Sequence, residues 1–187
     1  MAVCIEIMPS MKQARGYTLI ELMVTVTIVA ILAALAAPSF VRLIADNALS
    51  TQVNSLLADL RFARSEAIKR GINITLCPSS TSQDATATCG GSDWKAGWIA
   101  FIDNDANNSR ASTETILRRQ EKFTTGASIV SNNATPISSL RFNAEGRIPG
   151  GMSALNFTAT NDAAPNRLLC ISLTGRVRTV EKGATSC

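Results

Sequence analysis

The sequence predicts an α+β protein in which one long N-terminal helix packs on antiparallel β-sheets. Three observations support this fold class. Residues 17–37 form an apolar run of 21 residues. Residues 38–71 follow with apolar positions at helical spacing. After Gly71 the pattern changes to short apolar runs separated by residues that favour turns, which is typical of strands. A chain of 187 residues is long enough for one globular domain with an appended segment.

The apolar run 17–37 is long enough to cross a membrane and contains a single charged residue, Glu21. At about 1.5 Å per residue, a helix of this length spans roughly 31 Å, which matches a bilayer core of about 30 Å. Lys12 and Arg15 precede the run, so the positive-inside rule places the chain after it outside the cytoplasm. An ordinary signal peptide cleaved near Ala34–Ala36 is the alternative, but its apolar segment is normally shorter and it leaves Glu21 unexplained.

The residues around Glu21 carry a specific motif, Lys-Gln-Ala-Arg-Gly-Tyr-Thr-Leu-Ile-Glu-Leu at positions 12–22. It resembles the prepilin signature of type IV pilins and type II secretion pseudopilins. The resemblance implies cleavage after Gly16 by prepilin peptidase and methylation of the new N-terminus at Tyr17, where most members have Phe. It also implies that Glu21 acts in assembly. In a fibre its carboxylate would pair with the N-terminal ammonium of a neighbouring subunit, because an unpaired charge is costly in a low dielectric.

The expected leader is residues 1–16. A start at Met11 would leave a leader of six residues, Met11–Gly16, which is more typical of the motif. We therefore expect residues 1–10, including Cys4, to carry no function.

The second half of the helix, residues 38–71, is expected to be amphipathic. The charged and polar residues of this segment, including Gln52 and Asp59, lie mostly off the apolar stripe. Gly71 is a suitable C-terminal stop, and the basic pair before it suits the negative end of the helix dipole. The stripe expected to face the core consists of Leu49, Val53, Leu56, Leu57, Leu60, Ala63, Ala67 and Ile68.

Residues 72–187 are expected to form an exported β-rich domain. Stretches rich in Ser, Thr, Asn, Asp and Gly separate its apolar runs. The expected strands are Ile72–Cys77, Gly97–Ile102, Thr115–Glu121, Ser139–Asn143, Ala154–Thr158, Arg167–Leu173 and Arg176–Val180.

The whole arrangement resembles the FimT/GspH branch of minor pilins and pseudopilins, and most of all its FimT-like members. The globular part contributes Leu76-Cys77-Pro78, Trp94 and Trp98, Phe101-Ile102-Asp103 and a C-terminal Gly-Arg. The resemblance implies a pilin-like fold and other pilin or pseudopilin subunits as partners. It also implies a single-pass inner-membrane protein with a periplasmic domain, which later enters a pilus fibre or its extracellular tip.

An enzyme is not expected. The chain has no histidine, which excludes a Ser-His-Asp triad, a Cys-His pair and any His-ligated metal site. Carboxylate pairs suited to general acid–base work are not discernible. We expect no cofactor.

Four cysteines follow the leader: Cys77, Cys89, Cys170 and Cys187. An even number in an exported domain indicates disulfides. Four cysteines can be paired in three ways. We favour the pairing that forms two local disulfides, Cys77–Cys89 and Cys170–Cys187, because each closes a short loop. The spacings are wide and no Cys-x-x-Cys is present, so a zinc site is not expected.

Basic residues gather near the C-terminus, within a chain of net charge +4. From Arg141 onward there are six basic and three acidic residues. In the motif Gly-Arg-Val-Arg, strand alternation places Arg176 and Arg178 on one face, about 6.5–7 Å apart, comparable to the roughly 6–7 Å between successive phosphates of a DNA strand. Lys182 and Arg167 add charge nearby. These four residues are the candidate contacts for double-stranded DNA.

The resemblance associates the Gly-Arg-x-Arg pattern of FimT-like members with DNA binding during natural transformation, while the spacing alone establishes only feasibility. A solvated basic hairpin is the alternative. In that case the protein would be a structural subunit that primes the type IV pilus or belongs to a type II secretion pseudopilus.

Two further features have a structural explanation that we prefer. Asp103 to Asn108, with Glu114 at the twelfth position, is similar to a calcium-binding EF-hand loop. The segment lacks flanking helices, however, and an Asn/Asp-rich hairpin turn explains it, so we assign no metal. Trp94 and Trp98 could stack on bases, but we expect them in the core.

Overall fold

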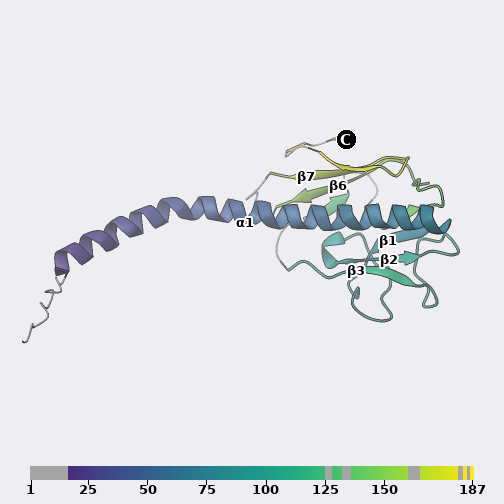
Figure 1. The fold of residues 1–187 in the computed structure, drawn as a ribbon, viewed down its shortest axis with the longest axis horizontal. Coiled ribbons are helices and arrows are strands. Elements are labelled where there is room, and N and C mark those ends of the chain that lie inside the picture. The colour runs from purple at the N-terminus through teal and green to yellow at the C-terminus, as the bar shows by residue number, and fades with distance from the viewer. Residues whose placement is uncertain (1–16, 125–127, 132–135, 160–164, 181–182, 185) are drawn as a thin grey trace, which may run out of the picture. The chain divides into compact units, whose positions relative to one another are not determined.

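The computed structural model describes residues 17–124, 128–131, 136–159, 165–180, 183–184 and 186–187. Within them the chain forms one long helix and two four-stranded sheets in which every strand pair is antiparallel (Figure 1). The predicted fold class is confirmed. The chain divides into two compact units between Ser39 and Phe40.

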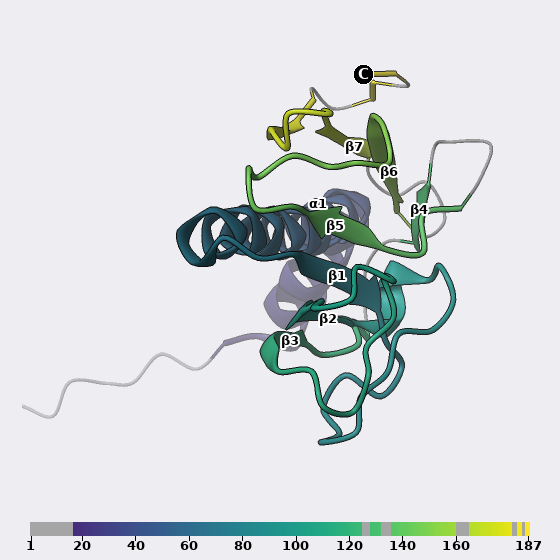
Figure 2. The same cartoon turned by 90° about the vertical axis from the view of Figure 1, so that its right-hand side faces the viewer.

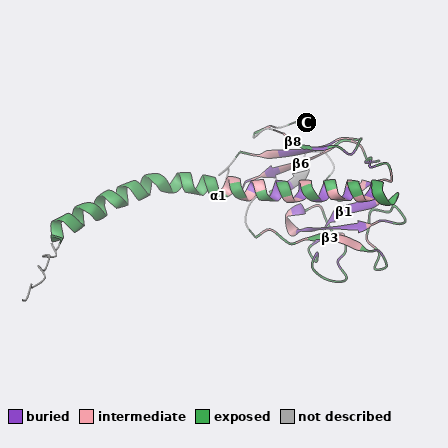
Figure 3. Cartoon of the chain, viewed as in Figure 1, coloured by how far each residue is buried: buried purple, intermediate pink, exposed green. Residues whose placement is uncertain are grey.

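Helix α1, Leu19–Arg70, contributes to both units. In the first unit its residues are exposed around the whole circumference (Figure 3). By length and composition, α1 is the one helix among the described residues that could cross a membrane. Its first turn is capped by Thr18, whose Oγ1 accepts a hydrogen bond from the backbone N–H of Glu21 at 3.3 Å.

In the second unit α1 packs its apolar stripe into the core. The predicted members Leu49, Val53, Leu56, Leu60, Ala63 and Ala67 are buried, and Leu57 is partly buried. Gly71 ends the helix as expected: its φ is 68°, and its N–H and that of Ile72 both donate to the carbonyl of Ala67.

Two expectations for this stripe were wrong. Ile68 is 52% exposed, because at the last turn of the helix it rests on the backbone of Gly146 and not on a sheet. Gln52 and Asp59 were expected mostly off the stripe, but both are buried. Asp59 tolerates burial because its carboxylate accepts hydrogen bonds from two other elements.

The first sheet has the order β3-β2-β1-β5. Its strands are β1 (Ile74–Pro78), β2 (Trp98–Ile102), β3 (Ile116–Gln120) and β5 (Leu140–Phe142). Period-two alternation divides its apolar residues between two layers. Residues such as Ile74 and Leu76 join the helix in the main core, whereas Ile99 and Phe101 join a smaller cluster on the other face. A one-turn 3-10 helix, η1 (Trp94–Ala96), precedes β2.

The second sheet has the order β4-β6-β7-β8. Its strands are β4 (Ser128–Ser131), β6 (Ser153–Thr158), β7 (Arg167–Ile171) and β8 (Val177–Thr179). One face adds Leu155, Phe157 and Leu169 to the core around α1. Figure 2 shows β6 and β7 on one side of this core and β1, β2 and β3 on the other.

All seven predicted strands are present, with ends that differ by one or two residues. Strand β4 was not predicted, because the run Ser-Ile-Val-Ser contains only two apolar residues.

Candidate functional site

The turn between β7 and β8 presents the Gly-Arg-Val-Arg motif. Gly175 N–H donates to the carbonyl of Ser172 at 2.8 Å, and Ser172 N–H donates to the carbonyl of Arg176 at 3.0 Å. Gly175 has a φ of 71°, and a Cβ at this position would overlap the carbonyl oxygen of Gly146. Only glycine fits both requirements, and this constraint on the turn sets the backbone position of the following residue, Arg176.

Arg176 and Arg178 are exposed and flank Val177, which is 7% exposed and belongs to the core. The two arginines therefore share one face, as strand alternation predicts. Both line an open groove of about 650 Å³, together with residues that include Ala154 and Cys170. Arg178 also donates to the main-chain oxygen of Cys187 at 3.5 Å.

The groove combines positive charge with apolar walls. Arg176 and Arg178 are its charged members, and no acidic side chain is among the described residues that line it. Met152, which is 66% exposed, and the Cys170–Cys187 disulfide contribute apolar surface. The two guanidiniums of such a groove can bind an anion through charge-assisted hydrogen bonds.

The other two predicted DNA contacts are placed differently. Arg167, the first residue of β7, forms an ion pair with Asp46 of α1 at 2.9 Å and is partly buried. It does not line the groove that holds Arg176 and Arg178. Lys182 lies outside the described residues.

Both disulfides have the local pairing. Cys77 joins Cys89 across 12 residues, next to the smaller apolar cluster. Cys170 of β7 joins Cys187 across 17 residues and holds the C-terminus at the groove.

The Asp/Asn-rich segment connects β2 to β3. Asp103, Asp105 and Glu114 bring their carboxylates within 4.8 Å of one another. Each of these carboxylates already accepts hydrogen bonds from amide groups of the loop; Glu114, for example, accepts from Asn104 and Ala111 at 2.8 and 2.9 Å. These hydrogen bonds hold the loop that joins β2 to β3.

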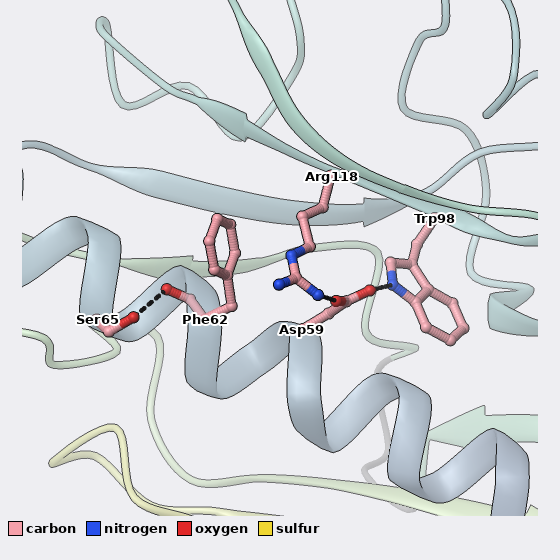
Figure 4. A network of polar contacts seen from close by, with 5 residues as sticks. All are labelled: Asp59, Phe62, Ser65, Trp98 and Arg118. Carbon is pink, nitrogen blue, oxygen red and sulfur yellow. Dashed lines mark hydrogen bonds and ion pairs between the residues drawn. The ribbon is translucent and has the colours of Figure 1, made fainter.

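A buried polar network explains several charged residues that could have been candidate sites. The Asp59 carboxylate accepts from Trp98 Nε1 at 2.8 Å and from Arg118 at 3.0 Å (Figure 4). Arg118 also stacks on the ring of Phe62, with 4.2 Å between its guanidinium carbon and the ring centroid. Trp94 Nε1 donates to a backbone carbonyl at 2.9 Å, and both tryptophans are fully buried, so neither can stack on a base.

Sequence reasoning missed two arginines on α1. Arg61 and Arg64 were assigned only to its polar face, yet together with Arg176 they line a second hollow of about 570 Å³. The i, i+3 spacing was a signal that the two share a side of the helix. Nothing in the sequence indicated that this side faces the β7–β8 turn.

The prepilin motif lies at the start of the first unit. Gly16 is outside the described residues, whereas Tyr17 and Glu21 are exposed. Glu21 occupies the first turn of α1, where a carboxylate also suits the positive end of the helix dipole.

Comparison with known proteins identifies relatives over most of the chain. The family model for type II transport protein GspH matches residues 52–175, and the model for the prokaryotic N-terminal methylation motif matches residues 11–37. The chain is 33% identical over 109 residues to the type IV narrow pilus major component PilA5 of Thermus thermophilus, covering 57% of this chain and 89% of that protein.

Two crystal structures of the type IV minor pilin FimU from Pseudomonas aeruginosa PAO1 have a similar fold. The TM-scores are 0.54 and 0.56, with 23% and 21% sequence identity. The similarity covers 71% and 74% of this chain and 92% and 97% of the FimU chains.

An apolar N-terminal helix with a methylation motif, continued into a helix-and-sheet domain of this type, defines the class of pilins and pseudopilins. Proteins of this class are structural subunits that interact with one another, and the apolar helix and the motif indicate membrane anchoring and pilus assembly. Within the class, the chain belongs to the GspH family, whose model matches about two thirds of its residues.

Proposed function

We propose that this subunit binds double-stranded DNA non-specifically through Arg176 and Arg178 during natural transformation. The observation that carries the proposal is their placement: both are exposed on one face and line one groove that has no acidic residue among its described members. A guanidinium forms charge-assisted hydrogen bonds to phosphate oxygens in a planar, bidentate geometry. Binding is therefore to the backbone, without catalysis or a cofactor.

The chemistry of the groove sets what kind of binding to expect. Both tryptophans are buried, so base stacking on them does not contribute. Recognition by phosphate contacts alone is indifferent to sequence and sensitive to salt, with a dissociation constant of about 10⁻⁴–10⁻⁶ M for one subunit. Several subunits in one fibre add avidity. In this proposal Arg167 and Lys182 add to the positive electrostatic potential that attracts the DNA. Arg167 adds less, because it already pairs with Asp46.

A DNA titration of the full-length protein in a non-ionic detergent tests the proposal. Two duplexes of unrelated sequence are titrated at several salt concentrations, and the logarithm of affinity is plotted against that of salt concentration. We expect equal affinity for both duplexes. Arg176→Ala/Arg178→Ala should weaken binding and make the slope shallower by about 2, one for each lost phosphate contact.

Lys122→Ala is the matched control for loss of positive charge. Lys122 is exposed and follows β3, an edge strand of the other sheet. It should bind as the wild type does. If the wild type does not bind, or if the double arginine variant binds as tightly as the wild type, these arginines are a solvated hairpin and the proposal is wrong.

The alternative function is structural: a subunit that primes type IV pilus assembly or forms part of a type II secretion pseudopilus, without DNA binding. The match of residues 52–175 to a type II transport family favours it. A deletion separates the two functions. Loss of transformation with pili intact supports DNA uptake, whereas loss of pili or of secretion supports the structural role.

For either function we propose the same route to the fibre. Prepilin peptidase cleaves after Gly16 and Tyr17 is methylated, while the domain after the helix lies in the periplasm. Glu21 then pairs with the N-terminal ammonium of a neighbouring subunit, and the protein enters the fibre or its tip. The methylation-motif match over residues 11–37 supports this order of events.

A further inference from the structure

The second hollow places three arginines around one space. Arg61 and Arg64 come from α1 and Arg176 from the β7–β8 turn, and the hollow has a volume of about 570 Å³. Its remaining described members are small, apolar or hydroxylated, and none is acidic. Three guanidiniums around one open space repel each other, and the arrangement favours an anion that bridges them.

Arg64 is held in place before any ligand arrives. Its Nε donates to the carbonyl of Gly146 at 3.1 Å, and the same carbonyl lies against Gly175. This contact uses Nε, so the two terminal nitrogens of Arg64 remain as donors for a ligand in the hollow that Arg64 lines with Arg176. A cation fixed in advance loses less conformational entropy on binding than a free one.

Nearby acidic residues do not neutralise this site. Glu66, the closest carboxylate along α1, is engaged by Arg70 at 2.5 Å. Glu145 is exposed on the loop beside Gly146 but does not line the hollow. The positive charge of the three arginines is therefore available to an external anion.

The two hollows share one residue. Arg176 lines both the groove with Arg178 and the hollow with Arg61 and Arg64. The charges thus form a continuous series from β8 over the turn to α1. Neighbouring members are separated by about 6.5–7 Å on the strand and by about 5–6 Å between Cβ atoms on the helix. An extended polyanion suits such a series better than a small ion, which would need only one of the two hollows.

We propose that the DNA-binding surface extends from the sheet onto helix α1, where Arg61 and Arg64 hold a further backbone phosphate of the strand bound by Arg176 and Arg178. This inference rests on the proposed function and adds a contact to it. The ligand class is the phosphodiester backbone of a nucleic acid. Arg61 is the better test residue, because it is exposed and no hydrogen bond of its side chain builds the fold among the described contacts.

The test is the DNA titration described above, with the full-length protein in non-ionic detergent and Arg61→Ala added. We expect the salt slope to become shallower by about 1 and the affinity near 0.1 M salt to fall about three- to tenfold. Arg61→Lys keeps the charge and should retain most of the slope. Thermal unfolding of each variant checks that the domain is intact, since an exposed helix position should tolerate both changes.

Each outcome decides the matter. If Arg61→Ala binds as the wild type does while Arg176→Ala/Arg178→Ala is weakened, the helix contact is wrong and the proposed function remains. If Lys122→Ala weakens binding as much as Arg61→Ala does, the effect is one of net charge and the helix contact is also wrong. If the wild type does not bind DNA at any salt concentration, both the proposed function and its extension are wrong.

Discussion

Gly175 is the residue on which the geometry of the site depends. Its positive φ and its contact with the carbonyl of Gly146 are two separate constraints. Gly183 has a φ of 83° but nothing within 4 Å of the position of a Cβ. Comparing alanine variants of Gly175 and Gly183 therefore separates the cost of the backbone conformation from the cost of steric overlap.

Gly175→Ala should lower the free energy of unfolding by about 2–5 kcal/mol, because a left-handed backbone costs about 1–2 kcal/mol and an overlap with a neighbouring backbone costs about 1–3 kcal/mol more. Gly183→Ala should cost only about 1–2 kcal/mol. Urea unfolding of the full-length protein in detergent, followed by tryptophan fluorescence, measures both. Equal losses for the two variants would show that the Gly146 contact does not constrain the turn.

Residue roles that depend on distant partners could not be predicted from the sequence. Asp59 lies 39 residues from Trp98 and 59 from Arg118, so no local pattern identifies it as a buried acceptor. Arg167 was grouped with the other C-terminal arginines, but its partner Asp46 is 121 residues away. Arg176 and Arg178 could be placed on one face because strand alternation depends only on neighbours in sequence.

At the level of elements, the two disulfides hold different parts of the second unit. Cys77–Cys89 fastens the loop after β1 to the smaller cluster, whereas Cys170–Cys187 fastens the C-terminus to β7. Their loops are similar in length, so chain entropy assigns each a similar stabilisation of about 3 kcal/mol. Their relation to the groove differs, because only the second disulfide lines it.

Replacing the cysteines of either disulfide by alanine should therefore lower stability by a similar amount. The two double variants should differ in their affinity for DNA. Cys77→Ala/Cys89→Ala should lower the free energy of unfolding by about 2–4 kcal/mol and leave DNA affinity unchanged. Cys170→Ala/Cys187→Ala should lower both, since the main-chain oxygen that accepts from Arg178 is no longer fixed. Urea unfolding and the DNA titration measure the two effects. Equal loss of DNA affinity in both variants would contradict a role of the second disulfide at the groove.

The elements themselves could be predicted where the pattern is local. The long helix, its end at Gly71 and seven of the strands followed from apolar spacing and turn residues. The partition into two sheets did not, because strand order depends on contacts between distant segments. For the same reason Arg61 and Arg64 could be assigned to one side of α1 but not to the turn beside them.

For the whole molecule, Glu21 is the residue that we propose to link the single chain to an assembly. It is exposed in the first turn of α1, and the helix residues that follow it in the first unit offer apolar surface. Thr18 and Glu21 also match a helix-capping pair, so the Glu21 side chain has a candidate local role besides the proposed subunit pairing.

Glu21→Gln keeps the capacity for capping but removes the charge, so it separates these two roles. If subunit pairing matters, Glu21→Gln should remain in the membrane and fail to enter fibres, while Thr18→Ala should assemble almost normally. Quantitative immunoblotting of sheared fibres and of membranes measures how much of each variant is in the fibres and how much remains in the membrane. Normal incorporation of Glu21→Gln would exclude a charge-based role in assembly.

Apart from Glu21, the exposed first part of α1 offers apolar surface on every side. Its threonines at 25 and 27 return their hydroxyls to backbone carbonyls of Leu22 and Met23, so they present methyl groups outward. Rotating or sliding such a helix along an apolar neighbour exchanges one set of methyl contacts for an equivalent set, and the energy changes little. We therefore expect a fibre core built from such helices to twist and lengthen under load while its subunits stay in contact.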